Sequence, residues 1–294
     1  MHRLLALLFV GMALSGLRAD ESDIRRDLER VYSDWRAALL AKSVEAWTRS
    51  TCAYRQMFTR NAIVSQGKVY PDSLFDLPFQ PPSVIGLQLV EVEAVGDTAH
   101  LLYFGRIDLG LEAEKIPENL MMLKFYKDAG AWKFDTTRYF NLGNDDDTRR
   151  QIRAGTADFY KHPPFNPPGV APAVPKPCNK PEKVGALRIH AIGYEVVASM
   201  NGYDYPPVAD DAEQQLIIGG LVRGDNKLQL TIKQLPLPKD DPSVERHLEV
   251  QAVMATEDLE KPTLRVFRWK PSAHPAPDKV ELNVRLDIRT MKGV

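Results

Sequence analysis

The first half of the chain contains several ionisable side chains that could bind a ligand or move a proton. They are Asp34, Tyr54, Arg55, His100, Tyr103, Asp108 and Asp135. A carboxylate or an imidazole beside a tyrosine hydroxyl can serve as base and acid toward one substrate. No spacing among these residues matches a catalytic motif. We therefore designate no catalytic residue, and we expect Tyr54, Arg55, His100 and Tyr103 to line a ligand pocket.

Asp135 ends the segment KDAGAWKFD, which predicts a turn and then a strand. Successive side chains of a strand point to opposite faces of the sheet. Trp132 and Phe134 should then pack toward the core, and Lys133 and Asp135 should point outward together. This structural interpretation of Asp135 holds unless a β-bulge changes the register.

The sequence does not predict a metal or cofactor site. The run Asn144 to Asp147 lacks the alternating oxygen ligands and central glycine of a calcium loop, so we interpret it as the cap of a helix that begins near Thr148. Cys52 and Cys178 have no metal-type spacing. They could form a disulfide, or they could stay unpaired with Cys52 buried on a helix as a small apolar residue.

The first 19 residues have the pattern of a secretory signal peptide. Arg3 precedes an apolar run from Leu4 to Leu14, which is too short for the about 20 residues that span a bilayer. Small residues follow, and we expect cleavage after Ala19. The sequence thus predicts an exported protein, periplasmic or extracellular, with no transmembrane segment after cleavage. The net charge of −1 gives no basic excess for nucleic acid.

A proline-rich segment divides the chain. Eight of the 22 prolines lie between Pro163 and Pro181, and such a run favours extended backbone over helix or central strand. We expect residues 20–160 and 184–294 to form two domains, with residues 161–183 as an interdomain linker.

The first domain should be α+β. Ile24, Leu28, Val31 and Trp35 lie on one face of an amphipathic helix for which Ser22 is the predicted N-cap. Ser43 is the predicted cap of two further short helices that end at Gly67. Several strands follow, and the last two form a hairpin around Asp128-Ala129-Gly130. We expect the helices to cover the concave face of a curved antiparallel sheet.

This order of elements, with its final GAWKFD strand, resembles the NTF2-like cone fold of ketosteroid isomerase and SnoaL-like proteins over residues 20–143. The resemblance implies a cavity between helices and sheet. Relatives of this fold include isomerases, hydrolases and dehydratases as well as proteins that only bind or dimerise. It also implies a homodimer through the open sheet face.

The second domain should be an antiparallel β-sandwich, because about seven short alternating segments occupy residues 184–294. Asn201-Gly202 predicts a tight turn. The segments around it resemble accessory sandwich domains, galactose-binding-like or Ig-like. Tyr203 and Tyr205 at a loop tip could contact a glycan or protein, although aromatics beside Pro206 and Pro207 also commonly pack their own loop.

We expect an exported two-domain protein with a non-catalytic binding or scaffold role. A small ligand would bind in the amino-terminal cone, and the sandwich would contact a glycan or an envelope protein. The alternative is an isomerase, hydrolase or dehydratase that uses the amino-terminal cavity. The two hypotheses differ in whether at least two ionisable groups converge inside that cavity.

Overall fold

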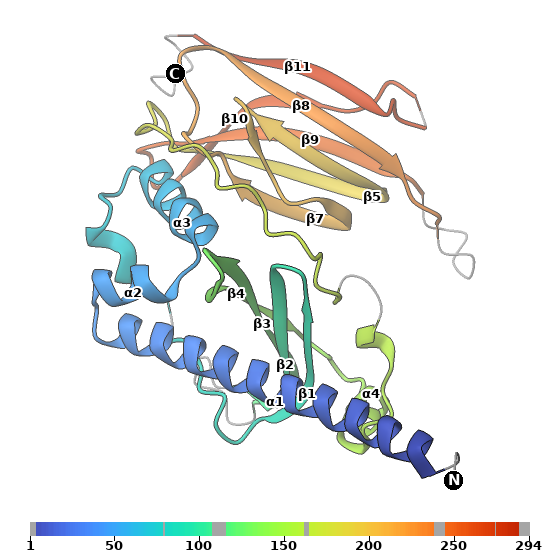
Figure 1. Ribbon diagram of the computed structural model, residues 1–294. Helices are drawn as coiled ribbons and strands as arrows, with labels where there is room; N and C mark the ends of the chain where they lie inside the picture. The colour runs from blue at the N-terminus through green and yellow to red at the C-terminus, as the bar shows by residue number, and fades with distance from the viewer. Residues whose placement is uncertain are drawn as a thin grey trace. The chain divides into compact units, whose positions relative to one another are not determined.

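The computed structural model describes residues 4–78, 80–107, 116–161, 165–237, 245–273 and 275–287, with side chains from residue 21 onward (Figure 1). The chain forms two compact units. The first contains residues 1–58 and 74–174, and the second contains residues 59–73 and 175–294. The division at 174 falls inside the proline-rich segment, whereas no pattern in the sequence indicated that residues 59–73 group with the second unit.

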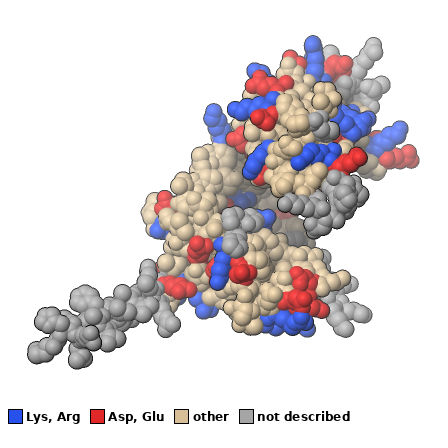
Figure 2. Space-filling model, turned by 90° about the vertical axis from the view of Figure 1, so that its right-hand side faces the viewer, with Lys and Arg blue, Asp and Glu red and all other residues tan. Residues whose placement is uncertain are grey.

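Charged side chains of both signs are interspersed on the face shown in Figure 2, with no large area of one sign. This distribution fits the net charge of −1.

The first helix, α1 (Leu4–Leu40), begins before the predicted N-cap, so Ser22 lies inside the helix and the prediction of a cap there is wrong. A short amphipathic pattern could not show that the helix extends further toward the amino end. Two short helices follow as predicted, α2 (Val44–Ser50) after its cap Ser43 and α3 (Ala53–Ser65). Within the described residues, no helix combines the length and apolarity needed to cross a membrane.

The first unit contains an antiparallel sheet in the order β1-β2-β3-β4. Its strands are β1 (Gln88–Val95), β2 (Thr98–Arg106), β3 (Glu118–Asp128) and β4 (Ala131–Phe140). The predicted hairpin between β3 and β4 is confirmed. Ala129 and Gly130 form its two-residue loop with positive φ angles of 49° and 82°, as the tight hairpin turns require.

One face of this sheet, which we call the first face, packs against α1 (Figure 1). An aromatic cluster fills the contact. The ring of Trp35 lies 4.1 Å from that of Phe134 and 5.6 Å from that of Tyr32, and the rings of Phe125 and Phe134 are 5.7 Å apart. These rings occupy the interface where the resemblance placed a ligand cavity.

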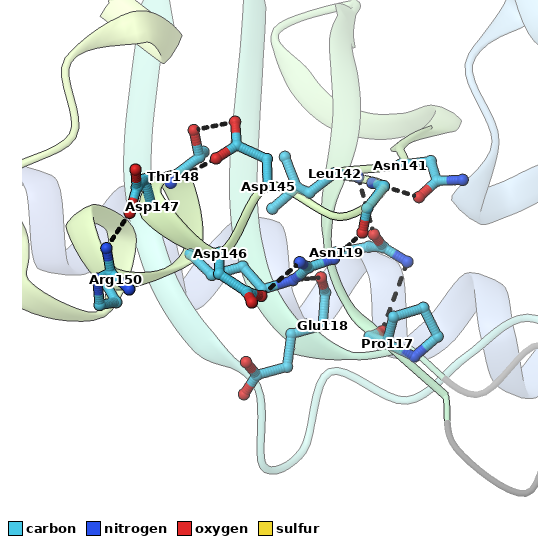
Figure 3. A network of polar contacts seen from close by, with 12 residues as sticks. Pro117, Glu118, Asn119, Asn141, Leu142, Asp145, Asp146, Asp147, Thr148 and Arg150 are labelled. Atoms are coloured by element: carbon cyan, nitrogen blue, oxygen red, sulfur yellow. Dashed lines mark hydrogen bonds and ion pairs between the residues drawn. The ribbon is translucent and has the colours of Figure 1, made fainter.

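The opposite face, the second face, is apolar at the end covered by α4 (Asp146–Ala154). Leu102, Leu120 and Met122 pack there against Ile152. The helix begins as predicted after its cap Asp145, which accepts hydrogen bonds from the backbone nitrogen and hydroxyl of Thr148 (Figure 3).

The second unit is built on a seven-stranded antiparallel sheet. Its strands are β5 (Gly185–Met200), β6 (Tyr203–Asp204), β7 (Val208–Leu216), β8 (Gly224–Gln234), β9 (His247–Ala255), β10 (Thr263–Trp269) and β11 (Lys279–Leu286). The α+β class and the antiparallel sheets are as predicted.

Strand β5 joins what we expected to be two separate sheets. Residues 185–192 pair with β9 and residues 194–200 pair with β8. Gly193, with φ of 72°, lies between the two segments. Both groups of strands contribute to one buried core, which includes Leu187, Val250 and Leu230. The hydrogen-bonded sheet is therefore continuous through β5.

The predicted turn at Asn201-Gly202 is confirmed, with φ angles of 53° and 81°. A fully buried asparagine, Asn226, supports this turn. Its amide oxygen accepts from the side chain of Asn201, and its amide nitrogen donates to the backbone oxygens of Val222 and Val284. All of this buried amide is thus hydrogen-bonded, as burial requires.

The proline-rich segment is hydrogen-bonded at Gly169 and at residues 176–178. In the first unit, the backbone nitrogen of Gly169 donates to the hydroxyl of Thr98. In the second unit, the buried Asn61 on α3 accepts from the backbone nitrogen of Cys178 at 2.9 Å and donates to the backbone oxygen of Lys176 at 2.8 Å. A proline-rich chain has few backbone donors, so side chains such as that of Asn61 hold it in place.

We predict that Asn61→Ala lowers the free energy of unfolding by about 1–3 kcal/mol, because it leaves the buried backbone nitrogen of Cys178 without an acceptor. Denaturant unfolding measures the loss, and hydrogen exchange measures the protection of the Cys178 amide. Gln66→Ala in the exposed turn directly after α3 is the matched control. Unchanged exchange at Cys178 in Asn61→Ala would contradict the assigned role.

Candidate functional site

Two β-bulges determine which side chains reach the second face of the first sheet. The pairing of β1 with β2 shifts between Leu89 and Glu91, and the pairing of β3 with β4 shifts between Lys124 and Phe125. Each shift adds one residue to a strand and changes the face of the residues that follow. The end of the second face away from α4 thereby becomes polar. We call this area the polar half, made of Glu91, Glu93, His100, Lys124, Tyr126 and Asp135.

Asp135 lies on the face opposite Phe134, as the alternation predicted, but it is buried, with only 3% of its surface exposed. Phe125 pairs with Phe134 and Lys124 with Thr136, so Asp135 is the extra residue of the bulge. The carboxylate accepts a hydrogen bond from Arg55 at 3.0 Å. The expectation of an exposed carboxylate is therefore wrong, because the start of α3 covers this part of the face.

The start of α3 places Arg55 beside this carboxylate. Thr51 forms a parallel bridge with Phe134 at the edge of β4, and the backbone nitrogen of Cys52 donates to the oxygen of Phe134. The guanidinium of Arg55 also lies 4.8 Å from the ring of Phe58. The ion pair and this cation–π contact orient the arginine from two sides.

Burial shifts the pKa values of the groups around Asp135. Loss of hydration and the negative charge of Asp135 raise the pKa of the Cys52 thiol to about 12. The pKa of Lys124 is lowered, first by burial and then by the nearby charge of Arg138. Cys52 is therefore a neutral thiol at physiological pH and a poor nucleophile.

The four residues predicted to line a pocket fall into three places. Tyr54 and Arg55 lie on α3 near Asp135, and the ring of Tyr54 is 6.2 Å from that of Tyr126. His100 belongs to the polar half. Tyr103 lies on the first face, and its hydroxyl donates to Glu29 at 2.7 Å. The four side chains thus do not line a common pocket, because His100 and Tyr103 point to opposite faces of β2.

Residues of β1 and β3 that no motif indicated complete the polar half. His100 pairs with Glu93 on β1 and with Lys124 on β3, and its Nε2 lies 3.0 Å from Glu91. The alternating acids of the segment VEVEA were the signal available in the sequence. Their meaning depends on strand pairing, which the sequence pattern did not provide.

A groove of about 760 Å³ lies elsewhere in the first unit, between α1, α2 and the turn that joins β3 to β4. Ala37, Ala38, Ala41 and Ala46 give it a lining of small side chains, and Trp132 lies among them. The described charged residues that line it are Asp27, Arg30, Asp34, Arg49 and Lys133.

Asp34 lies on the solvated side of α1, as the helical pattern indicated. Its carboxylate is 3.6 Å from Arg30, which also lies 3.7 Å from Asp27. Asp108, the remaining acid considered in the sequence, lies outside the described residues.

In the second unit, the two tyrosines proposed as contact residues have partners within the fold. Tyr205 is buried, and its hydroxyl accepts from the backbone nitrogen of Ile218. Tyr203 is half-buried and donates to the backbone oxygen of Pro177. The loop-packing alternative therefore describes these residues, and they do not form an exposed aromatic pair.

Cys52 and Cys178 are both free and buried, which corresponds to the unpaired alternative. The thiol of Cys178 contacts the backbone oxygen of Asn61 and the hydroxyl of Ser65.

We predict that Cys52 resists thiol reagents in the folded protein, because its thiol is buried and stays protonated at about pH 8. Its pKa rises on folding, so the stability it contributes is present below its ordinary value of 9.0 and is lost as the pH rises toward 12. The Cys178→Ser variant isolates Cys52 for labelling with a chromogenic disulfide, with urea-unfolded protein as the control. Rapid labelling of the folded variant would contradict this assignment.

Comparison with known proteins finds no match: no family model matches the chain, and no curated protein and no solved structure is significantly similar to it.

Proposed function

We propose that this chain is an exported, non-catalytic binding protein whose first unit holds a small ligand. The observation that carries the proposal is the groove of about 760 Å³ between α1, α2 and the β3–β4 turn. Small-molecule sites in proteins commonly have volumes of about 300–1,000 Å³. The groove replaces the interior of the cone as the ligand site, since aromatic rings fill the contact between α1 and the sheet.

The lining of the groove suits a ligand with a flat apolar body and an acidic group. The alanines leave room for a bulky group beside the indole of Trp132, and the ammonium of Lys127 lies 4.6 Å from the centre of the same ring. Arg30 lies between Asp27 and Asp34, at 3.7 Å and 3.6 Å, and offsets part of their negative charge. Lys133 donates only to the backbone oxygen of Arg49 among its described hydrogen bonds, so its ammonium is the cation available for an acidic ligand.

The paired state of the ionisable groups supports binding over catalysis. Asp135 is committed to Arg55, and Tyr103 to Glu29. The described residues that line the groove include neither cysteine nor histidine. An isomerase, hydrolase or dehydratase would need an acid and a base that converge on a substrate, whereas Asp27 and Asp34 in the groove both lie beside Arg30.

For the fold, we propose an NTF2-like first unit and a sandwich-like second unit. The order of three helices and an antiparallel meander supports the first assignment. The sandwich-like assignment is supported by the two halves of β5, which pair with β9 and β8 while all three strands contribute to one apolar core. We assign the second unit a scaffold role with protein or glycan contact through surfaces other than Tyr203 and Tyr205.

We predict that Ala37→Trp abolishes ligand binding, because an indole at this exposed lining position fills the groove. Anilinonaphthalene sulfonate, a flat anionic fluorophore, is the probe. Its affinity should fall about tenfold or more, a free-energy change of about 1.4 kcal/mol or more. Ser33→Trp, on the same helix outside the lining, is the matched control. Equal affinity in the two variants would refute the groove as the site.

We predict that the natural amino-terminal segment directs export and is removed after Ala19. The full chain is expressed in a bacterium, and the periplasmic product is sequenced from its amino end. Asp20 should be the first residue. Leu8→Arg should prevent export by interrupting the apolar run. A cytoplasmic product that still begins at Met1 would overturn the assignment.

A further inference from the structure

Three side chains with metal-ligand chemistry meet on β1 and β2, at one edge of the first sheet. Glu93 lies opposite His100 in the pairing of β1 with β2, and Glu91 lies two residues before Glu93. In a regular strand, Glu91 would pair with Leu101 and share the first face. The register shift after Leu89 pairs it with Leu102 instead, and so both glutamates share the face of His100.

The ligand atoms offered by Glu91, Glu93 and His100 all lie within 4.8 Å of one another. The imidazole Nε2 is 3.0 Å from one carboxylate oxygen of Glu91. Bound transition metals lie about 2.0–2.2 Å from imidazole nitrogens and carboxylate oxygens. Small side-chain rotations would therefore bring all three ligands onto one ion.

His100 is the most deeply buried of the three ligands. The residue is 1% exposed, and Nε2 is the ring nitrogen that faces Glu91. An ion shared with the carboxylates would therefore bind Nε2. The ring proton would then lie on Nδ1, which has no hydrogen-bond partner among the described residues.

We propose that Glu91, Glu93 and His100 form a binding site for a divalent transition-metal ion such as zinc. One imidazole and two carboxylates suit such an ion, whereas calcium and magnesium prefer oxygen ligands alone. Three protein ligands leave a fourth position for water. The ion would offset the repulsion of two neighbouring carboxylates and tie β1 to β2.

No ion pair among the described residues joins the nearby cation Lys124 to Glu91 or Glu93. Lys124 pairs with His100 between β2 and β3, and its pKa is lowered first by burial and then by the charge of Arg138 on β4. None of the three ligands lines the groove, so this inference is independent of the proposed ligand binding.

Isothermal titration of the full chain with zinc alone tests the site. We expect one ion per chain. The zinc affinity of Glu93→Gln, which keeps the size of the side chain but removes its charge, should be lower than that of the natural chain by a factor of about ten or more. His100→Gln should lose binding as well. Circular dichroism checks that both variants fold. If the variant at the buried position, His100→Gln, does not fold, Glu93→Gln still tests the site.

Two controls separate this site from nonspecific binding. Glu195→Gln changes a half-buried strand glutamate outside the site and should bind zinc like the natural chain. His190→Gln removes one of two neighbouring histidines on β5 and β9, whose rings are 4.5 Å apart and which are a competing place for zinc. Retained affinity in Glu93→Gln, loss in His190→Gln alone, or equal affinity for magnesium would each overturn the proposal.

Discussion

The ion pair between Asp135 and Arg55 organises the first unit. A carboxylate that is almost fully buried is stable only with a charged and hydrogen-bonded partner. Asp135 lies at the bulge in β4, and Arg55 reaches it because Thr51 and Cys52 attach the start of α3 to the edge of the same strand. Burial, together with the negative charge of Asp135, raises the pKa of the Cys52 thiol. The contact of β4 with the start of α3 therefore brings the ion pair and the buried cysteine together.

The two bulges also give the sheet two unlike faces. The first face is apolar and is covered by α1 with closely packed aromatic rings. The second face is apolar only beneath α4. The polar half of this face carries three carboxylates, a histidine and a lysine. Ligand chemistry is consequently found beside α1 and α2 and on the polar half, rather than in the interior between helices and sheet.

The proline-rich segment shows how a chain with few backbone donors becomes part of two folded units. Polyproline-type backbone has no internal hydrogen bonds, so its carbonyls and remaining N–H groups take partners from elsewhere. Thr98 supplies one such partner in the first unit, and Asn61 supplies two in the second. This dependence explains why residues 59–73 belong with the second unit although they follow the first in sequence.

The sequence by itself determined the features that depend on local backbone energetics. These are the α+β class, the cap at Asp145, the cap at Ser43 and the turns at Ala129-Gly130 and Asn201-Gly202. Only the tertiary structure decided the burial of Asp135, the grouping of Glu91 and Glu93 with His100, and the burial of Tyr205. Those depend on strand register and bulges, which are set by long-range packing. A shift of one residue reverses the face of every side chain that follows.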